Sequence, residues 1–146
     1  MKACNRNISS ICGNLENLNG YFIKNQKMTV LIVDDSPLII QKIDELLQEL
    51  AITLKLISCG THSEAIELLD EFRPSVVIVD INLPDKSGIE VLTSIKRNHP
   101  KTIVIMCTNQ VSNYYREQCF KLGASYFIDK SKDFENIPRL IYSLYN

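Results

Sequence analysis

Short apolar runs of strand length alternate along the chain with segments of helical periodicity. The first run, TVLIV at residues 29–33, leads into Ser36 and Pro37, which suit a helix N-cap and first turn. Apolar residues then recur at the three- and four-residue spacing of one helix face, at Ile39, Ile43, Leu46, Leu47 and Leu50. This pattern predicts one strand followed by one helix.

The same alternation continues through the rest of the chain. Further strands are predicted at residues 53–59, 75–80, 102–108 and 125–130. The helix after the second strand begins with a capping box of Thr61 and Glu64 and ends before Pro74. The next helix ends before Pro100, and the one after it ends at Gly123. Each predicted strand is therefore followed by a helix.

The start of the last helix has two candidates, because Asp133 and Asn136 are both suitable N-caps. Pro138 favours the later start, since proline is tolerated only in a first turn. The strands are apolar on both faces, which predicts a parallel sheet covered on both sides by right-handed crossovers. We therefore expect an α/β fold with a doubly wound, five-stranded parallel sheet.

The first 27 residues follow neither period and are rich in Asn. We interpret residues 1–27 as a poorly ordered extension in front of a single domain at residues 28–146. The alternative that Met28 is the translational start stays open, because the first strand begins directly after it.

Composition narrows the functional classes. The 146 residues are 45% hydrophobic and 23% charged with a net charge of −1, which gives no electrostatic case for nucleic acid or a membrane surface. No run approaches the roughly 20 apolar residues of a membrane span, and the N-terminus lacks the apolar core of a signal peptide. The five cysteines show no C-x-x-C spacing, so we expect free thiols and a cytoplasmic protein.

Polar side chains stand at the carboxyl ends of the predicted strands. Asp34 and Asp35 follow the first strand, and the third, fourth and fifth strands end at Asp80, Thr108 and Lys130. In an open parallel sheet, ligands bind beyond these ends, where the strand order reverses. With the strand order 2-1-3-4-5, all five side chains would converge on one crevice.

These residue types suit a cation and an anionic group together. Three carboxylates with no histidine or thiolate beside them form an all-oxygen site of the kind Mg²⁺ prefers. Lys130 and Thr108 supply a positive charge and a hydroxyl donor that suit a phosphoryl group opposite the metal. Each Asp taken singly is more often a turn former or helix cap, but five suitable residues on four strand ends favour a site.

The order and placement of these residues resemble the response-regulator receiver domains of two-component signalling, over about residues 29–146. The resemblance implies a flavodoxin-like fold and a phosphoryl-accepting signalling domain that is not an enzyme. Asp80 would accept the phosphoryl group from a phosphohistidine on a sensor kinase. The matching motifs are VLIVDDS, VVIVDINLPDKSGIEVL, IMCTNQ and YFIDKS.

The resemblance also implies how the site is divided among residues. Asp35, Asp80 and the backbone carbonyl of Asn82 would bind Mg²⁺ directly, and Asp34 would hold it largely through water. Lys130 would pair with Asp80 before transfer and with the phosphoryl group afterwards.

Further residues would transmit and time the signal. Thr108 would hydrogen-bond a phosphoryl oxygen, and Phe127 would turn from an exposed to a buried rotamer. This change would reach the face formed by the fourth helix, fifth strand and fifth helix. Asn82 and Gln110 would flank the attacking water and tune the lifetime of the phosphorylated state. One departure from the family is Ser131, where proline usually follows the lysine.

The chain shows no pattern of a further domain after the fifth helix, so we expect a stand-alone receiver similar to the chemotaxis regulators. It would bind a protein target when phosphorylated or, as a phosphorelay intermediate, pass its phosphoryl group to a histidine phosphotransfer protein. Expected partners are a sensor histidine kinase or a phosphotransfer protein, with no nucleic acid and no membrane, and the state is a monomer or a phosphorylation-dependent dimer. The enzyme-class alternative is a Mg²⁺-dependent phosphatase of the haloacid dehalogenase type. That family needs D-x-D after its first strand, whereas Ser36 and Pro37 follow Asp35 here.

Overall fold

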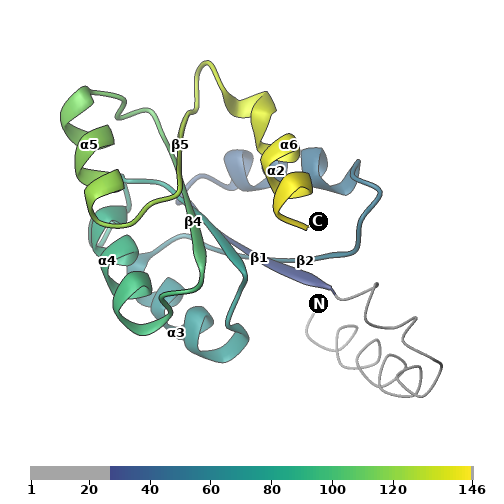
Figure 1. Ribbon diagram of the computed structural model, residues 1–146, viewed down its shortest axis with the longest axis horizontal. Helices are drawn as coiled ribbons and strands as arrows, with labels where there is room; N and C mark the ends of the chain where they lie inside the picture. The colour runs from purple at the N-terminus through teal and green to yellow at the C-terminus, as the bar shows by residue number, and fades with distance from the viewer. Residues whose placement is uncertain (1–26, 146) are drawn as a thin grey trace.

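The computed structural model describes residues 27–145, so the predicted extension at residues 1–27 lies outside it except for Lys27. In the described part, five parallel strands form one sheet in the order β2-β1-β3-β4-β5 (Figure 1). The strands are β1 (Met28–Val33), β2 (Leu54–Cys59), β3 (Val76–Val79), β4 (Ile103–Thr108) and β5 (Tyr126–Asp129). The predicted α/β class, parallel sheet and strand order are confirmed.

Helices cover both faces of this sheet. They are α2 (Pro37–Gln48), α3 (His62–Phe72), α4 (Gly88–Asn98), α5 (Asn113–Lys121) and α6 (Ile137–Tyr145), with a 3₁₀ turn η2 (Phe134–Asn136). Helices α2 and α6 pack on one face, and α3, α4 and α5 pack on the other (Figure 1). None of the helices between residues 27 and 145 has the length and apolar character needed to cross a bilayer.

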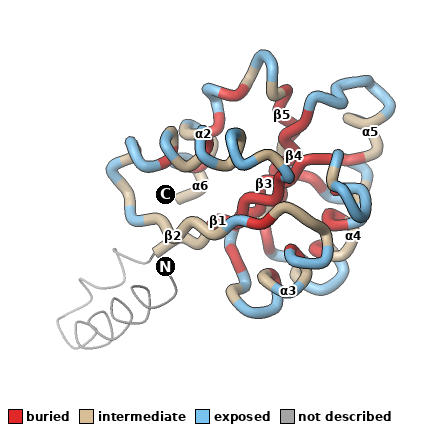
Figure 2. Tube along the Cα trace, turned by 180° about the vertical axis from the view of Figure 1, so that it is seen from behind, coloured by how far each residue is buried: buried red, intermediate tan, exposed pale blue. Residues whose placement is uncertain are grey.

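Each face of the sheet has its own apolar core. In β1, Leu31 and Val33 pack with α3, α4 and α5, whereas Val30 and Ile32 pack with α2 and α6. All four residues of β3 are buried, and the central strands form the buried interior seen in Figure 2. Because both sides of the central strands are covered, their sequences are apolar without alternation.

The helix ends follow local signals. Thr61 caps α3 and accepts a hydrogen bond from the Glu64 N–H at 3.1 Å, which is the first half of the predicted capping box. The Glu64 carboxylate accepts from the Thr61 hydroxyl at 3.0 Å. The same helix ends at Arg73, whose φ of 45° lies in the left-handed region that non-glycine residues rarely adopt. Helix α6 begins at Ile137 after the η2 turn, which places Pro138 in its first turn. The later of the two predicted starts is therefore the one observed for the α-helix.

Candidate functional site

Backbone hydrogen bonds bring the polar ends of the strands to one edge of the sheet. The N–H of Asp80 donates to the Val33 carbonyl at 3.0 Å, and the N–H of Lys130 donates to the Thr108 carbonyl at 3.1 Å. Thr108 also pairs with Asp129 in the β4–β5 register. These bonds continue the parallel ladders past the last strand residues, so the side chains that follow β1, β3 and β5 meet beside Thr108.

Three carboxylates form a cluster at this edge. Asp34, Asp35 and Asp80 each offer an oxygen within 4.8 Å of the others, the one such group of potential metal ligands within residues 27–145. Asp34 and Asp80 are buried, whereas Asp35 is exposed. A donor set made only of carboxylate oxygens, with one face toward solvent, fits Mg²⁺, which keeps several water ligands.

Lys130 lies between the two buried carboxylates. Its Nζ is 2.6 Å from Asp34 Oδ2 and 2.7 Å from Asp80 Oδ2, and its side chain is only 8% exposed. Burial works against the charge of this amine, but the hydrogen bonds to Asp34 and Asp80 outweigh it and raise the pKa of Lys130. Sequence reasoning anticipated the contact with Asp80 but not the equally short one with Asp34.

The Asp80 carboxylate is oriented by contacts at both oxygens. Oδ1 accepts a hydrogen bond from the Asn82 N–H at 3.3 Å, and Oδ2 accepts the bond from Lys130. Behind it, the backbone of Gly88 approaches so closely that a Cβ on Gly88 would lie 1.8 Å from the Asp80 carbonyl oxygen. Gly88 belongs to the motif VVIVDINLPDKSGIEVL, but the sequence alone does not show that it packs against Asp80.

The loop between β3 and α4 contains another residue whose contacts the sequence did not predict. Asp85 accepts hydrogen bonds from the N–H groups of His62 and Ser63, at 2.9 and 3.0 Å, at the start of α3. The hydrogen bond from the His62 N–H is the largest cause that lowers the pKa of Asp85, and the bond from the Ser63 N–H adds to it. Together they lower this pKa to about 2. The β3–α4 loop is thereby attached to the first turn of α3, where the first backbone N–H groups have no partner within the helix.

The two predicted switch residues, Thr108 and Phe127, are both buried. Thr108 is fully buried, and its Oγ1 accepts a hydrogen bond from the Gln110 N–H at 3.1 Å. Phe127 is 7% exposed, with the Arg116 guanidinium 4.8 Å from the centre of its ring. The structure thus shows Phe127 in a buried position and Gln110 in contact with Thr108 through its backbone.

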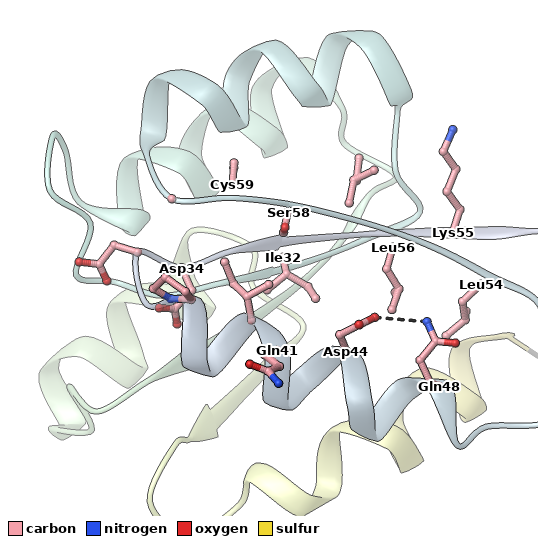
Figure 3. A pocket seen from close by; sticks show the side chains of 15 residues that line it. Ile32, Asp34, Gln41, Asp44, Gln48, Leu54, Lys55, Leu56, Ser58 and Cys59 are labelled. Carbon is pink, nitrogen blue, oxygen red and sulfur yellow. Dashed lines mark hydrogen bonds between the residues drawn. The ribbon is translucent and has the colours of Figure 1, made fainter. Parts of the chain in front are cut away.

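A groove leaves the acidic cluster along the edge strand. It has a volume of about 800 Å³, lies between α2 and β2, and has Asp34 and Asp35 among its lining residues. Figure 3 shows Asp34 at one end of it. The side chains of β2 that line it are mostly apolar, with Lys55 and Ser58 among them, and α2 contributes both apolar and polar side chains, the polar ones being Gln41, Asp44 and Gln48. Among the latter, the Gln48 amide donates to Asp44 at 3.2 Å. Two members of the acidic cluster, Asp34 and Asp35, therefore also border a longer groove.

Several known proteins have sequences similar to this chain. The sequence profile of the response regulator receiver domain matches residues 30–142. The DNA-binding transcriptional activator EvgA of Escherichia coli K12 is 30% identical over 82% of this chain and 58% of its own length. Protein CcdB of Bacillus subtilis is 34% identical over 77% of this chain and 96% of its own. The chain thus spans little more than half of EvgA but nearly all of CcdB.

Solved structures share the fold. The signal receiver domain of a putative Luxo repressor protein from Vibrio parahaemolyticus superposes with a TM-score of 0.75 at 24% identity, over 82% of this chain and 91% of that one. The BeF3-activated DrrB receiver domain gives a TM-score of 0.71 at 28% identity, over 82% and 97%. Sequence, topology and the acidic edge of the sheet lead to one conclusion: the chain belongs to the receiver domains of response regulators.

Proposed function

We propose that Asp80 accepts a phosphoryl group from a phosphohistidine of a sensor histidine kinase or a phosphotransfer protein, in a Mg²⁺-dependent reaction. The observation that carries this proposal is the position of Asp80 in the acidic cluster, with the Lys130 Nζ 2.7 Å from its Oδ2. A carboxylate oxygen of Asp80 attacks phosphorus, the phosphorus–nitrogen bond breaks, and the imidazole nitrogen keeps the bonding electrons. The product is an acyl phosphate on Asp80.

The residues around Asp80 would have separate roles in the phosphoryl transfer. Lys130 moves its hydrogen bond from Asp80 to a phosphoryl oxygen, where its charge offsets the charge that arrives. Asp35, Asp80 and the Asn82 carbonyl would hold Mg²⁺ directly, with Asp34 bound largely through water. Bound Mg²⁺ would neutralise charge on the phosphoryl oxygens.

The effect of Asp80 phosphorylation would be transmitted to the surface through Thr108 and Phe127. The Thr108 hydroxyl accepts a bond from Gln110 and still has a proton to donate to a phosphoryl oxygen. Movement of its loop would shift the packing around Phe127 and reach the surface of α5, β5 and α6, the fourth helix, fifth strand and fifth helix of the receiver. Tyr114 and Phe120 are 68% and 44% exposed on α5, which suits a protein-binding surface. Asn82 and Gln110 would set the lifetime of the acyl phosphate.

The output is proposed to be a protein contact, either with a target or, in a relay, with a phosphotransfer protein. The chain matches 96% of the length of CcdB but 58% of the length of EvgA. The names of other relatives describe DNA-binding regulators, so the expectation of no nucleic-acid partner finds no support in them. That expectation, the oligomeric state and the cytoplasmic location stay predictions.

The test is phosphorylation of the purified protein with acetyl phosphate, followed by intact mass and mapping of the modified residue. We expect one added phosphoryl group on Asp80 that requires Mg²⁺, and we expect Asp80→Asn to remove it while the fold is kept. Label on Asp34 or Asp35 would instead indicate the haloacid dehalogenase type of phosphatase. Unchanged labelling of Asp80→Asn would reject Asp80 as the acceptor.

A further inference from the structure

The loop after β5 carries Lys130 but has no proline next to the lysine. Lys130 has a flexible four-carbon side chain, so its Nζ reaches Asp34 and Asp80 reproducibly only if its backbone is held in place. The Lys130 N–H is held by the Thr108 carbonyl at 3.1 Å, which secures the strand side of the loop. After Lys130 the chain turns away from the sheet at Ser131. The contacts of this turn determine the position of the Lys130 backbone.

Four hydrogen bonds of this turn converge on Asp129. Its Oδ1 accepts from the Ser131 N–H at 2.8 Å and from the Ser131 hydroxyl at 2.6 Å. Its backbone carbonyl accepts from the N–H groups of Lys132 and Asp133 at 3.2 and 2.8 Å. The two residues that flank Lys130 in sequence are thus bound to each other by two side-chain hydrogen bonds.

The environment of Asp129 suits a lasting contact. Asp129 is 7% exposed, whereas Ser131 is exposed, so the two hydrogen bonds between them are partly buried. The hydrogen bond from the Ser131 hydroxyl lowers the pKa of Asp129 most, and the hydrogen bond from the Ser131 N–H lowers it further. The Asp129 carboxylate therefore stays ionised at neutral pH. The short distance of 2.6 Å between Asp129 Oδ1 and Ser131 Oγ is that of a charge-assisted bond.

We propose that Asp129 and Ser131 are positioning residues for phosphoryl transfer: the clasp between them fixes the turn that holds the Lys130 Nζ between Asp34 and Asp80. The proposal rests on the proposed function, in which Lys130 moves from Asp80 to the phosphoryl group. In this chain the carboxylate and hydroxyl of the clasp restrict the turn at the position where the family usually has a proline ring.

A purely structural turn and a positioning clasp predict different measurements. If the clasp only stabilises the start of η2 and α6, its loss lowers the melting temperature and leaves the chemistry of the folded protein unchanged. If it positions Lys130, its loss weakens the hold on a phosphoryl group without weakening the hold on Mg²⁺, since Lys130 is not a metal ligand.

The experiment compares four variants of the full chain. Asp129→Ala removes both clasp bonds, Ser131→Ala removes only the hydroxyl bond, and Asp129→Asn keeps an oxygen acceptor. Asp133→Ala removes a carboxylate from the same loop that makes no side-chain cap bond, which makes it the matched control. For each variant we would measure the rate of Asp80 phosphorylation by acetyl phosphate, the affinity for BeF₃⁻ as a phosphoryl analogue, and the affinity for Mg²⁺ alone by calorimetry.

We expect Asp129→Ala to lower the phosphorylation rate and the BeF₃⁻ affinity about tenfold, because loss of orientation is costly for a reacting group. The Mg²⁺ affinity should stay within about twofold, since no metal ligand changes. Ser131→Ala should cause about a threefold loss, in line with one hydrogen bond. Asp129→Asn should restore most of the rate, and Asp133→Ala should match the wild type.

Rates and BeF₃⁻ affinities equal to wild type in folded Asp129→Ala would overturn the proposal, as would a parallel loss of Mg²⁺ and BeF₃⁻ affinity. If Asp129→Ala does not fold, Ser131→Ala decides, because it keeps the carboxylate and the amide bond. A wild-type protein that takes up no phosphoryl group on Asp80 would instead reject the proposed function, so the two failures are distinguishable.

Discussion

Two loops at the carboxyl edge of the sheet carry the two sides of the site, and they are held in different ways. The β3–α4 loop, which begins at Asp80, is held by distant contacts: Asp85 bonds to residues 22 and 23 positions earlier, and Gly88 packs against the Asp80 backbone. The loop after β5 is held by its immediate neighbours, through Asp129 and Ser131. The loop that carries Asp80 is therefore held by tertiary packing, and the loop that carries Lys130 is held by a local turn.

This difference predicts different consequences of mutation. A change at Gly88 separates elements that are packed together, so the stability and the phosphorylation of Asp80 should fall together. A change at Asp129 or Ser131 leaves the sheet and helices in place, so the phosphorylation of Asp80 should fall more than the stability. The following variants test this division, from the largest expected effect to the smallest.

Gly88→Ala should have the largest effect. The added Cβ would lie 1.8 Å from the Asp80 carbonyl oxygen, which is a backbone atom and cannot turn aside. The start of α4 must then move away from the end of β3. We expect a loss of about 3 kcal/mol or more in the free energy of unfolding, measured by urea denaturation, together with loss of Asp80 phosphorylation.

Gly60→Ala is the matched control, because its Cβ would make only ordinary contacts, 3.6 Å from the Asp35 Cα. We expect a change of less than about 1 kcal/mol in this variant. Equal stabilities of the Gly88 and Gly60 variants would show that the close approach to Asp80 does not hold the loop.

Lys130→Met should have an intermediate effect on stability. Removal of the amine leaves the buried carboxylates of Asp34 and Asp80 without their cation, and removal of one partner from a buried ion pair is costly. We expect a loss of about 2 kcal/mol in metal-free buffer, measured by urea denaturation. Added Mg²⁺ should recover more stability in this variant than in the wild type, since a cation then returns to the carboxylates.

Lys132→Met is the control for Lys130→Met, because Lys132 is exposed two residues further along the same loop. It should unfold like the wild type with and without Mg²⁺. If both lysine variants lose the same stability, the buried pairing of Lys130 contributes nothing beyond its charge.

The site was predictable where its geometry follows from the order of the strands. Apolar runs separated by helical periods predicted the parallel sheet, and the order 2-1-3-4-5 was adopted as the one in which the polar strand ends converge. The observed order is the same and brings Asp34, Asp80, Thr108 and Lys130 together. Asp85 gave no local signal, because its partners at the start of α3 lie 22 and 23 residues away. Such contacts appear only when the fold is known.

Other features differ in how far sequence reasoning reaches. The spacing of Asp129 and Ser131 is a local pattern typical of a side-chain turn, so this contact was accessible in principle. The need for glycine at Gly88 depends on how closely two backbone segments approach, which residue types do not specify. The roles of Asn82, Gln110 and Phe127 come from the family resemblance, since nothing in their residue types points to timing or switching.

Asp85→Ala should have the smallest effect of the three loop variants. Its loss leaves the N–H groups of His62 and Ser63 without the carboxylate, so we expect a decrease of about 2–4 °C in melting temperature at pH 7. Phosphorylation of Asp80 should slow by no more than about twofold, since Asp80 keeps its bonds to Asn82 and Lys130. Glu67→Ala, which removes an exposed carboxylate from α3, is the control.

The pH dependence of this variant identifies the cause of its lower stability. The pKa of Asp85 falls from an ordinary 3.8 to about 2 in the folded protein, so the unfolded chain binds the proton more readily. The contribution of Asp85 is therefore complete above the ordinary value and is lost as the pH falls from about 4 toward 2. The melting temperatures of wild type and Asp85→Ala should converge over this range. A gap that stays constant would show that the ionised carboxylate is not what holds the β3–α4 loop to α3.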